Sequence, residues 1–185
     1  FEKVPERGVT GDLGGAFMGL QVLEREKQVF LANPDMQPGL EKYDYIVGRQ
    51  LKPEARTEII YDLEEFGVIP TSMIDVSDGL ASELLHISKE SNVGIRIYED
   101  KVPIDELTFQ TAVEFNLDPI TCALNGGEDY ELLFTVRKED QDKMKNHPDV
   151  HMIGYIHPRA DQNVMVTKQG NVVPLRAQGW DHLKQ

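Results

Sequence analysis

A strand–helix–strand pattern in the middle of the chain constrains the fold most. Residues 72–74 are a short apolar run suited to a buried strand. Residues 79–92 place apolar side chains every three to four positions, which is the spacing of one helix face. Residues 94–98 then alternate apolar and polar side chains, as a strand does. A strand, a helix and a second strand in succession predict a layered α/β structure.

The remaining segments add helices and strands to this unit. Helical spacing and helix-end signals predict further helices at residues 16–27, 40–51, 53–67, 106–115 and 140–146. Apolar runs and alternation predict further strands at residues 131–136, 151–156 and 163–167, with a hairpin return at 172–173. Pro53 and Gly67 frame one of the helices, in the usual order of proline first and glycine last. We therefore predict an α/β (α+β) fold with a mixed sheet covered by helices.

The length and charge of the chain narrow its partners. Its 185 residues suit one domain, or a domain with an appendage. The formal net charge of −13 argues against a nucleic acid as partner. Phosphate ligands remain compatible with this charge, because a divalent cation can bridge carboxylates to phosphate.

Cysteine content and hydropathy indicate the compartment. Cys122 is the single cysteine, so no intrachain disulfide and no cysteine-based metal site are expected. There is no apolar run of the length that a membrane helix needs, and no basic-then-apolar leader. We expect a cytoplasmic protein without a membrane partner.

The sequence MIDVSDGL, residues 73–80, is the first candidate site. Asp75 is expected at the carboxyl end of a strand and Asp78 at the start of the next helix, where ligands of α/β sheets commonly bind. Carboxylates are hard oxygen donors that can share magnesium. Gly79 allows close backbone approach, and the helix start offers free N–H groups to phosphate. One interpretation is a metal-bridged phosphate site.

The alternative interpretation of MIDVSDGL is a simple helix start. Ser77 or Asp78 would then cap the helix, as such residues commonly do. This accounts for one of the two but gives no reason for Asp75 at the end of an apolar run. A cap and a metal site can also coexist at one helix N-terminus, so both interpretations stay open.

A second candidate is LNGGEDYELLF, residues 124–134. A double glycine precedes an acidic turn, and a predicted strand follows. The segment is either a solvated turn or a bend in which Glu128 and Asp129 face a ligand.

Other stretches carry less chemistry. The glycine-rich residues 8–15 lack the lysine and the serine or threonine of a P-loop, so we expect a strand-to-helix turn there and not a nucleotide cradle. His86 is expected at the surface or boundary of its helix, and Cys122 in the core. Trp180 either pins the C-terminal tail to the core or stacks on a flat heteroaromatic ligand.

The order of these motifs resembles a known family. Asp-Val-Ser-Asp-Gly-Leu is followed about fifty residues later by Asn-Gly-Gly-Glu-Asp-Tyr-Glu-Leu. A Val-Thr-Gly-Asp-Leu-Gly turn precedes both, and Gly-Trp follows near the end. Together they resemble the thiamine-monophosphate kinase family of the AIR-synthase-like superfamily, over essentially the whole chain.

The resemblance implies a fold, a reaction and a set of site residues. It implies a three-layer α/β/α C-terminal domain and ATP-dependent phosphorylation of thiamine monophosphate to thiamine diphosphate. Asp75 and Asp78 would hold magnesium, of which several ions are expected, and Ser77 would contact ATP. Glu128 and Trp180 would contact thiamine monophosphate. Members of the family usually form homodimers.

The chain departs from the family pattern in lacking the N-terminal domain with its own metal-binding aspartates. We therefore expect residues 1–185 to be the C-terminal domain, with residues 1–30 near the junction to an N-terminal ATP- and metal-binding domain. Such a chain should fold but not turn over on its own. The alternatives are another AIR-synthase-like ATP-dependent enzyme, or a non-catalytic acidic α/β domain that binds a divalent cation or a protein partner.

Overall fold

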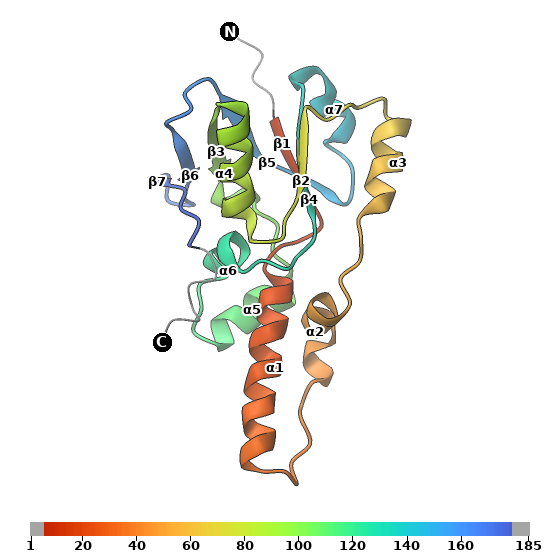
Figure 1. The fold of residues 1–185 in the computed structure, drawn as a ribbon, viewed down its shortest axis with the longest axis vertical. Coiled ribbons are helices and arrows are strands. Elements are labelled where there is room, and N and C mark those ends of the chain that lie inside the picture. Colours follow the sequence, from red (N-terminus) through yellow and green to blue (C-terminus); the bar gives the residue numbers. More distant parts are fainter. Residues whose placement is uncertain (1–5, 179–185) are drawn as a thin grey trace.

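The strands form one mixed sheet. A computed structural model describes residues 6–178, and within them seven strands are ordered β2-β4-β1-β5-β3-β6-β7 (Figure 1). Their bounds are β1 Glu6–Thr10, β2 Ser72–Asp75, β3 Gly94–Tyr98, β4 Leu132–Val136, β5 Val150–His157, β6 Asn163–Val166 and β7 Val172–Pro174. Strands β3 and β6 pair in parallel, and every other neighbouring pair is antiparallel. The predicted mixed sheet and its closing hairpin are confirmed.

Helices connect and cover the strands. The α-helices are α1 Gly15–Ala32, α2 Asp44–Leu51, α3 Thr57–Glu65, α4 Leu80–Ser91, α5 Glu106–Glu114, α6 Pro119–Asn125 and α7 Gln141–Met144. Short 3-10 turns lie at η1 Glu41–Tyr43, η2 Glu99–Lys101 and η3 Lys138–Asp140. None of the helices between residues 6 and 178 is long and apolar enough to cross a membrane.

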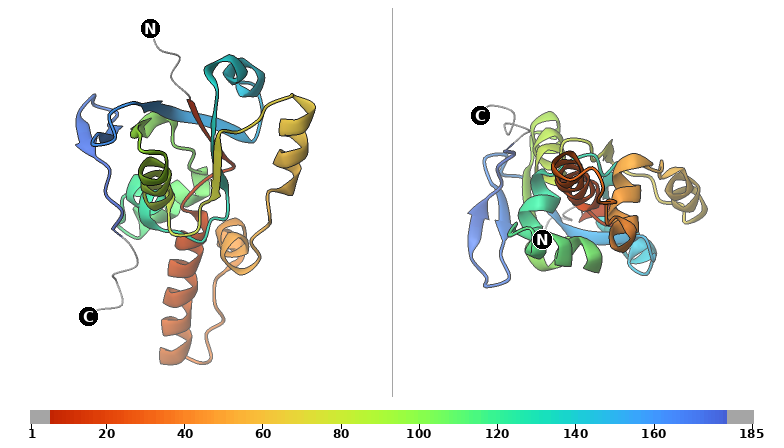
Figure 2. Two further views of the ribbon diagram at one scale, coloured as in Figure 1. Left: turned by 45° about the horizontal axis from the view of Figure 1, so that its top comes forward. Right: turned by 90° about the horizontal axis from the view of Figure 1, so that it is seen from below.

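The sheet is covered on both faces, which confirms the expected three layers. Neighbouring residues of a strand point to opposite faces, and β4 illustrates the result. Leu133 packs into the core that contains the apolar face of α4, whereas Phe134 packs into a second core with residues of α3 and α7. Figure 2 shows α4 set apart from α3 and α7 around the strands.

A third core lies beyond one end of the sheet, where α1 packs against α2 and α5 (Figure 1). Gly19 makes the α1–α2 contact possible: a Cβ there would lie 2.1 Å from the backbone oxygen of Ile46. The close contact brings α2 alongside the first turns of α1. Helix α2 carries Arg49, which reaches the candidate site described below.

Some elements differ from the sequence-based expectations. Strand β1 carries no clear strand signal in the sequence, because Val9 is its single apolar side chain and the alternation is weak. Helix α6 was also missed, although Asp118 as N-cap before Pro119 is a recognisable start signal. The helix expected from Pro53 begins only at Thr57, after a connection in which Arg56 reaches the buried Glu131.

Candidate functional site

The two acidic motifs meet in one continuous backbone junction. Beyond the β2–β4 ladder, Val76 donates its N–H to the oxygen of Glu131 at 2.7 Å, and Tyr130 donates to the oxygen of Val76 at 2.9 Å. Glu128 then donates to the oxygen of Ser77 at 2.7 Å. Segments about fifty residues apart in the sequence therefore form a single surface.

Two glycines permit this junction. Gly127 has a φ of +71°, and a Cβ there would lie 2.6 Å from the oxygen of Ser77. Gly79 has a φ of +102°, and a Cβ there would lie 2.7 Å from the oxygen of Leu124. Both positions combine a left-handed backbone with close backbone approach, which only glycine accommodates without strain. The group that approaches Gly79 is the backbone of α6, and the approach of a phosphate expected there stays a prediction.

The start of α4 corrects the capping interpretation. Gly79 is the N-cap residue, and no side chain makes a capping hydrogen bond there. Glu83 instead reaches back and accepts the N–H of Asp78 at 3.1 Å. The prediction that Ser77 or Asp78 caps the helix is therefore wrong, because both residues precede the N-cap position.

The aspartates of the first motif are left available. Asp75 and Asp78 are both exposed, and among residues 6–178 neither carboxylate makes a hydrogen bond or an ion pair. Ser77 is half-buried between them. An exposed carboxylate without a partner at the end of a strand contributes little to stability, so its presence there favours binding.

Glu128 and Tyr130 complete an acidic cluster with these aspartates. The hydroxyl of Tyr130 donates to Oε2 of Glu128 at 2.9 Å. This hydrogen bond, the charge of Glu128 and the nearby charges of Asp75 and Asp78 raise the pKa of Tyr130. Glu128 and Tyr130 also adopt left-handed φ values of 63° and 52°. Such conformations in non-glycine residues cluster at functional sites.

The donor set fits magnesium shared with phosphate better than a closed protein cage. Within residues 6–178 no group of three or more histidine, cysteine, aspartate or glutamate side chains is arranged to hold a metal. Asp75 and Asp78 offer exposed oxygens from one loop. Magnesium commonly takes one or two carboxylates and completes its shell with water and substrate phosphates. The metal assignment of these aspartates stays a prediction.

Asp129 points inward, so the expectation that it faces a ligand is wrong. Its side chain is fully buried and accepts the N–H groups of Gly14 at 2.8 Å and Ala16 at 3.3 Å, at the start of α1. Burial raises the pKa of Asp129 to about 7, against the lowering effect of these hydrogen bonds and of Arg49. Its carboxylate therefore satisfies free N–H groups of a helix N-terminus from a distant loop.

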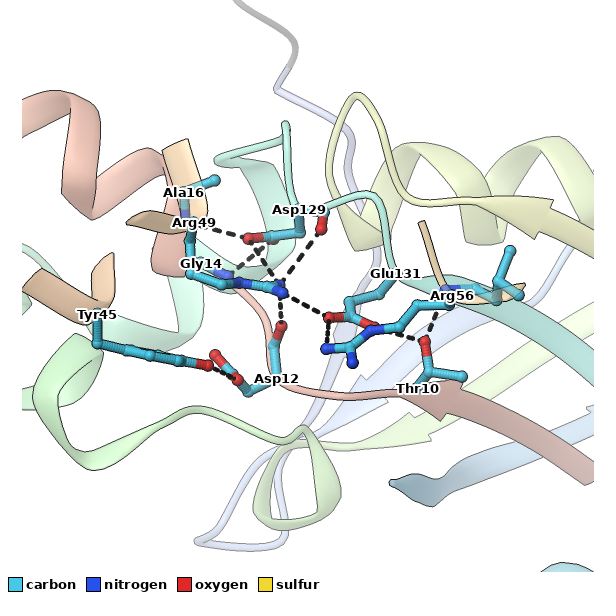
Figure 3. Close-up of polar contacts among 10 residues, drawn as sticks. Thr10, Asp12, Gly14, Ala16, Tyr45, Arg49, Arg56, Asp129 and Glu131 are labelled. Carbon is cyan, nitrogen blue, oxygen red and sulfur yellow. Dashed lines mark hydrogen bonds and ion pairs between the residues drawn. The ribbon is translucent and has the colours of Figure 1, made fainter. Parts of the chain in front are cut away.

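Glu131 is fully buried and fully paired (Figure 3). Its oxygens accept the hydroxyl of Thr10 at 2.5 Å and a two-point contact from Arg56 at 2.6 and 2.7 Å. Arg49 pairs with it at 2.8 Å. A buried carboxylate is tolerated when charged hydrogen bonds surround it in this way.

Sequence reasoning missed the partners Arg49 and Arg56. They lie 82 and 75 residues before Glu131, in and after α2, and no local pattern links them to it. The sequence did contain a signal that Asp129 and Glu131 point inward. In extended chain, alternate side chains point to opposite sides, so Glu128 and Tyr130 lie on one side, and Asp129 and Glu131 lie on the other.

The glycine turn, His86 and Cys122 lie where the sequence predicted them. Residues 11–14 form the turn from β1 into α1, so the expected strand-to-helix turn is confirmed. His86 is exposed on α4, and Cys122 is 3% exposed in the core, both as expected. Trp180 lies outside the described residues.

Comparison with known proteins identifies the family. Residues 15–167 match the family described as AIR synthase related protein, C-terminal domain. The chain belongs to this family. The resemblance to the AIR-synthase-like superfamily that the motifs indicated is thereby confirmed.

Full-length relatives are about twice as long. A thiamine-monophosphate kinase from Pyrococcus horikoshii is 32% identical over 176 residues, covering 95% of this chain and 49% of the relative. The thiamine-monophosphate kinase from Bacillus subtilis is 32% identical over 181 residues, covering 95% of this chain and 52% of the relative. The chain thus spans about half the length of the curated relatives that it matches.

A solved structure agrees with this fold. AaThiL complexed with AMPPCP and TMP superposes with a TM-score of 0.75 at 24% identity, covering 97% of this chain and 52% of that one. The likeness extends over nearly all of the present chain and half of the other.

Proposed function

We propose that this chain is the C-terminal domain of a thiamine-monophosphate kinase, which transfers a phosphoryl group from ATP to thiamine monophosphate. The observation that carries the proposal is the hydrogen-bonded junction between residues 75–80 and 126–131. It gathers Asp75, Asp78 and Glu128 at the carboxyl end of β2, where α/β sheets bind ligands. The curated relatives named above carry this activity in their names.

The site residues receive distinct roles. Asp75 and Asp78 hold magnesium, Ser77 contacts ATP, and Glu128 contacts thiamine monophosphate. Trp180 is proposed to stack near that substrate. In support, AaThiL was solved with AMPPCP, an ATP analogue, and TMP bound. Magnesium, when bound, would supply positive charge between the two phosphate groups and align them.

The proposed reaction depends more on the positioning of the two substrates than on proton transfer. The acceptor is an oxygen of a phosphate monoester, already anionic near neutral pH, so little help from a general base is needed. Phosphoryl transfer depends mainly on alignment and on stabilisation of charge. The exposed carboxylates of Asp75 and Asp78 suit metal binding, and the tyrosine-held carboxylate of Glu128 suits orientation of the acceptor.

The complete enzyme is proposed to need more than this chain. Residues 1–30 would lie near the junction to an N-terminal domain that supplies further ATP and metal contacts. The enzyme is proposed to be a cytoplasmic homodimer. The 185 residues alone are expected to fold without turning over.

The decisive experiment measures formation of thiamine diphosphate from ATP and thiamine monophosphate by the protein at full length. Saturable, magnesium-dependent turnover is expected, and Glu128→Gln should weaken binding of thiamine monophosphate in isothermal titration. Turnover by the 185-residue chain alone would contradict the proposed division of labour.

The same experiment separates the alternatives. Hydrolysis or transfer with a different acceptor would point to another AIR-synthase-like enzyme. Magnesium binding without nucleotide binding, at full length, would point to a non-catalytic cation-binding domain.

A further inference from the structure

The acidic loop of residues 128–131 is held by side-chain contacts on its inner side, in addition to the backbone hydrogen bonds that join it to residues 76–77. Glu128 and Tyr130 face the acidic cluster and bond to each other. Asp129 and Glu131 face the interior and are gripped by α1, by Thr10 and by two arginines. The position of Glu128 therefore depends on the contacts of its buried neighbours as well as on its own backbone hydrogen bond to Ser77.

Arg49 is the side chain that joins these contacts (Figure 3). Its Nη1 pairs with Oε1 of Glu131 at 2.8 Å. Its Nη2 donates to the backbone oxygen of Asp129 at 3.3 Å and to that of Asp12 at 3.0 Å. The guanidinium, with a side chain 12% exposed, thus ties the acidic loop to the glycine turn before α1.

We propose that Arg49 is a positioning residue that fixes the acidic loop so that Glu128 meets the acceptor substrate. The inference rests on the proposed kinase function. Arg49 itself faces the interior, so it acts through the loop and does not touch the reacting atoms. The backbone oxygen that it holds belongs to Asp129, the residue next to Glu128.

The geometry requires an arginine and not merely a positive charge. Two guanidinium nitrogens serve three oxygen acceptors that lie on two segments. A lysine ammonium is a single compact charge on a flexible stem and cannot reproduce the planar fork. Lysine could still neutralise Glu131 while losing the bridge to the backbone oxygens.

Arg56 provides a useful contrast. It grips Glu131 through both carboxylate oxygens, at 2.6 and 2.7 Å, and makes no hydrogen bond to the loop backbone. With Arg49 replaced, Glu131 keeps Arg56 and Thr10 as partners. The carboxylate would stay paired, and the change would fall mainly on the loop.

The test is steady-state kinetics of the full-length protein with each substrate varied in turn. Arg49→Lys and Arg49→Met are expected to raise the KM for thiamine monophosphate about tenfold, the effect of losing one hydrogen bond to a charged donor. The KM for magnesium-ATP should change less than about twofold, because the nucleotide contacts lie on other residues.

Arg25→Met is the matched control. Arg25 lies on α1 and pairs with Glu26 and Glu114, away from the loop. It should lower the melting temperature without changing either KM. This control separates the general effect of losing a guanidinium group from the effect of losing the contacts that Arg49 makes between the loop and the glycine turn.

The possible outcomes distinguish a positioning role of Arg49 from a structural one. A wild-type KM in Arg49→Lys would overturn the inference, since charge alone would then suffice. Equal increases in both KM values, or loss of the folded state in both variants, would also overturn it, because Arg49 would then be a structural residue. Absence of thiamine monophosphate turnover in the unaltered protein would instead refute the proposed function.

Discussion

The junction contains two kinds of carboxylate, which have the same chemistry but differ in burial and in hydrogen bonding. We call the exposed ones outer and the buried ones inner. Asp75 and Asp78 are exposed and, within residues 6–178, unpaired. Asp129 and Glu131 are buried and hydrogen-bonded, one by the start of α1 and the other by two arginines. An acidic side chain that stabilises this fold is thus enclosed, and one that is free to bind is not.

The difference teaches how one short loop serves both needs. Alternation along residues 128–131 sends every second side chain inward. The inward residues anchor the loop, and the outward residues inherit a fixed position. If the comparison is correct, inner substitutions should reduce stability, and outer substitutions should reduce activity.

The largest expected effect is on stability, from Glu131→Gln. It leaves Arg49 and Arg56 facing a neutral amide in a buried setting, which should lower the free energy of unfolding by about 3–5 kcal/mol. Chemical denaturation measures the loss. Glu114→Gln is the control, because Glu114 also meets two cations but is 42% exposed. Its loss should cost about 1 kcal/mol or less, and equal losses would contradict the comparison.

The next effect is on activity, from Asp75→Asn in the full-length protein. Loss of a proposed metal ligand should reduce kcat about 100-fold or more and change the magnesium dependence. The melting temperature should not fall, since the carboxylate has no described partner to lose. Asp142→Asn, at an exposed position of α7, is the control and should leave kcat intact. Unchanged magnesium dependence in Asp75→Asn would refute the metal assignment.

A third prediction uses the pKa of Asp129. The folded-state pKa of about 7 lies above the ordinary 3.8, so between these values the folded state binds the proton more strongly. The contribution of this group to stability is therefore greatest below about pH 4 and falls as pH rises towards 7.

Asp129→Asn should remove this dependence. On going from pH 8 to pH 5, the unaltered protein should gain about 2–3 kcal/mol of stability relative to the variant. Denaturation at both pH values measures the difference. Parallel pH profiles of the two proteins would show that the inner carboxylate does not titrate in this range.

The smallest effect concerns the junction itself. Gly127→Ala and Gly170→Ala both place a Cβ at a left-handed residue, with φ values of +71° and +85°. Only at Gly127 would the Cβ meet backbone, the oxygen of Ser77 at 2.6 Å, whereas nothing lies within 4 Å at Gly170. Gly127→Ala should destabilise by about 1 kcal/mol more. Equal shifts in the melting temperature of the two variants would mean that the backbone of the junction can move to accommodate the added Cβ at little cost.

The sequence predicted what local patterns encode. The unit β2–α4–β3 follows from periodicity, and the place of Asp75 after a strand and of Asp78 before a helix follows from the same pattern. The binding role of these aspartates stays a prediction. The buried ion pairs could not be found in this way, because Arg49 and Arg56 meet Glu131 only through tertiary packing. The capping prediction failed because Gly79, with its unusual backbone, occupies the position that Ser77 or Asp78 was expected to take.

The central place of β1 has a consequence for the order of folding. Its hydrogen-bonding neighbours are β4 and β5, which lie more than 120 residues later in the chain. A ribosome therefore releases β1 long before either neighbour exists, and both of its edges stay open during that time. Pairings of such long sequence separation slow folding and expose strand edges to aggregation. Strands β2 and β3 also wait for later strands, because β2 pairs with β4, and β3 pairs with β5 and β6. The sheet therefore forms only when residues 132–166 have emerged.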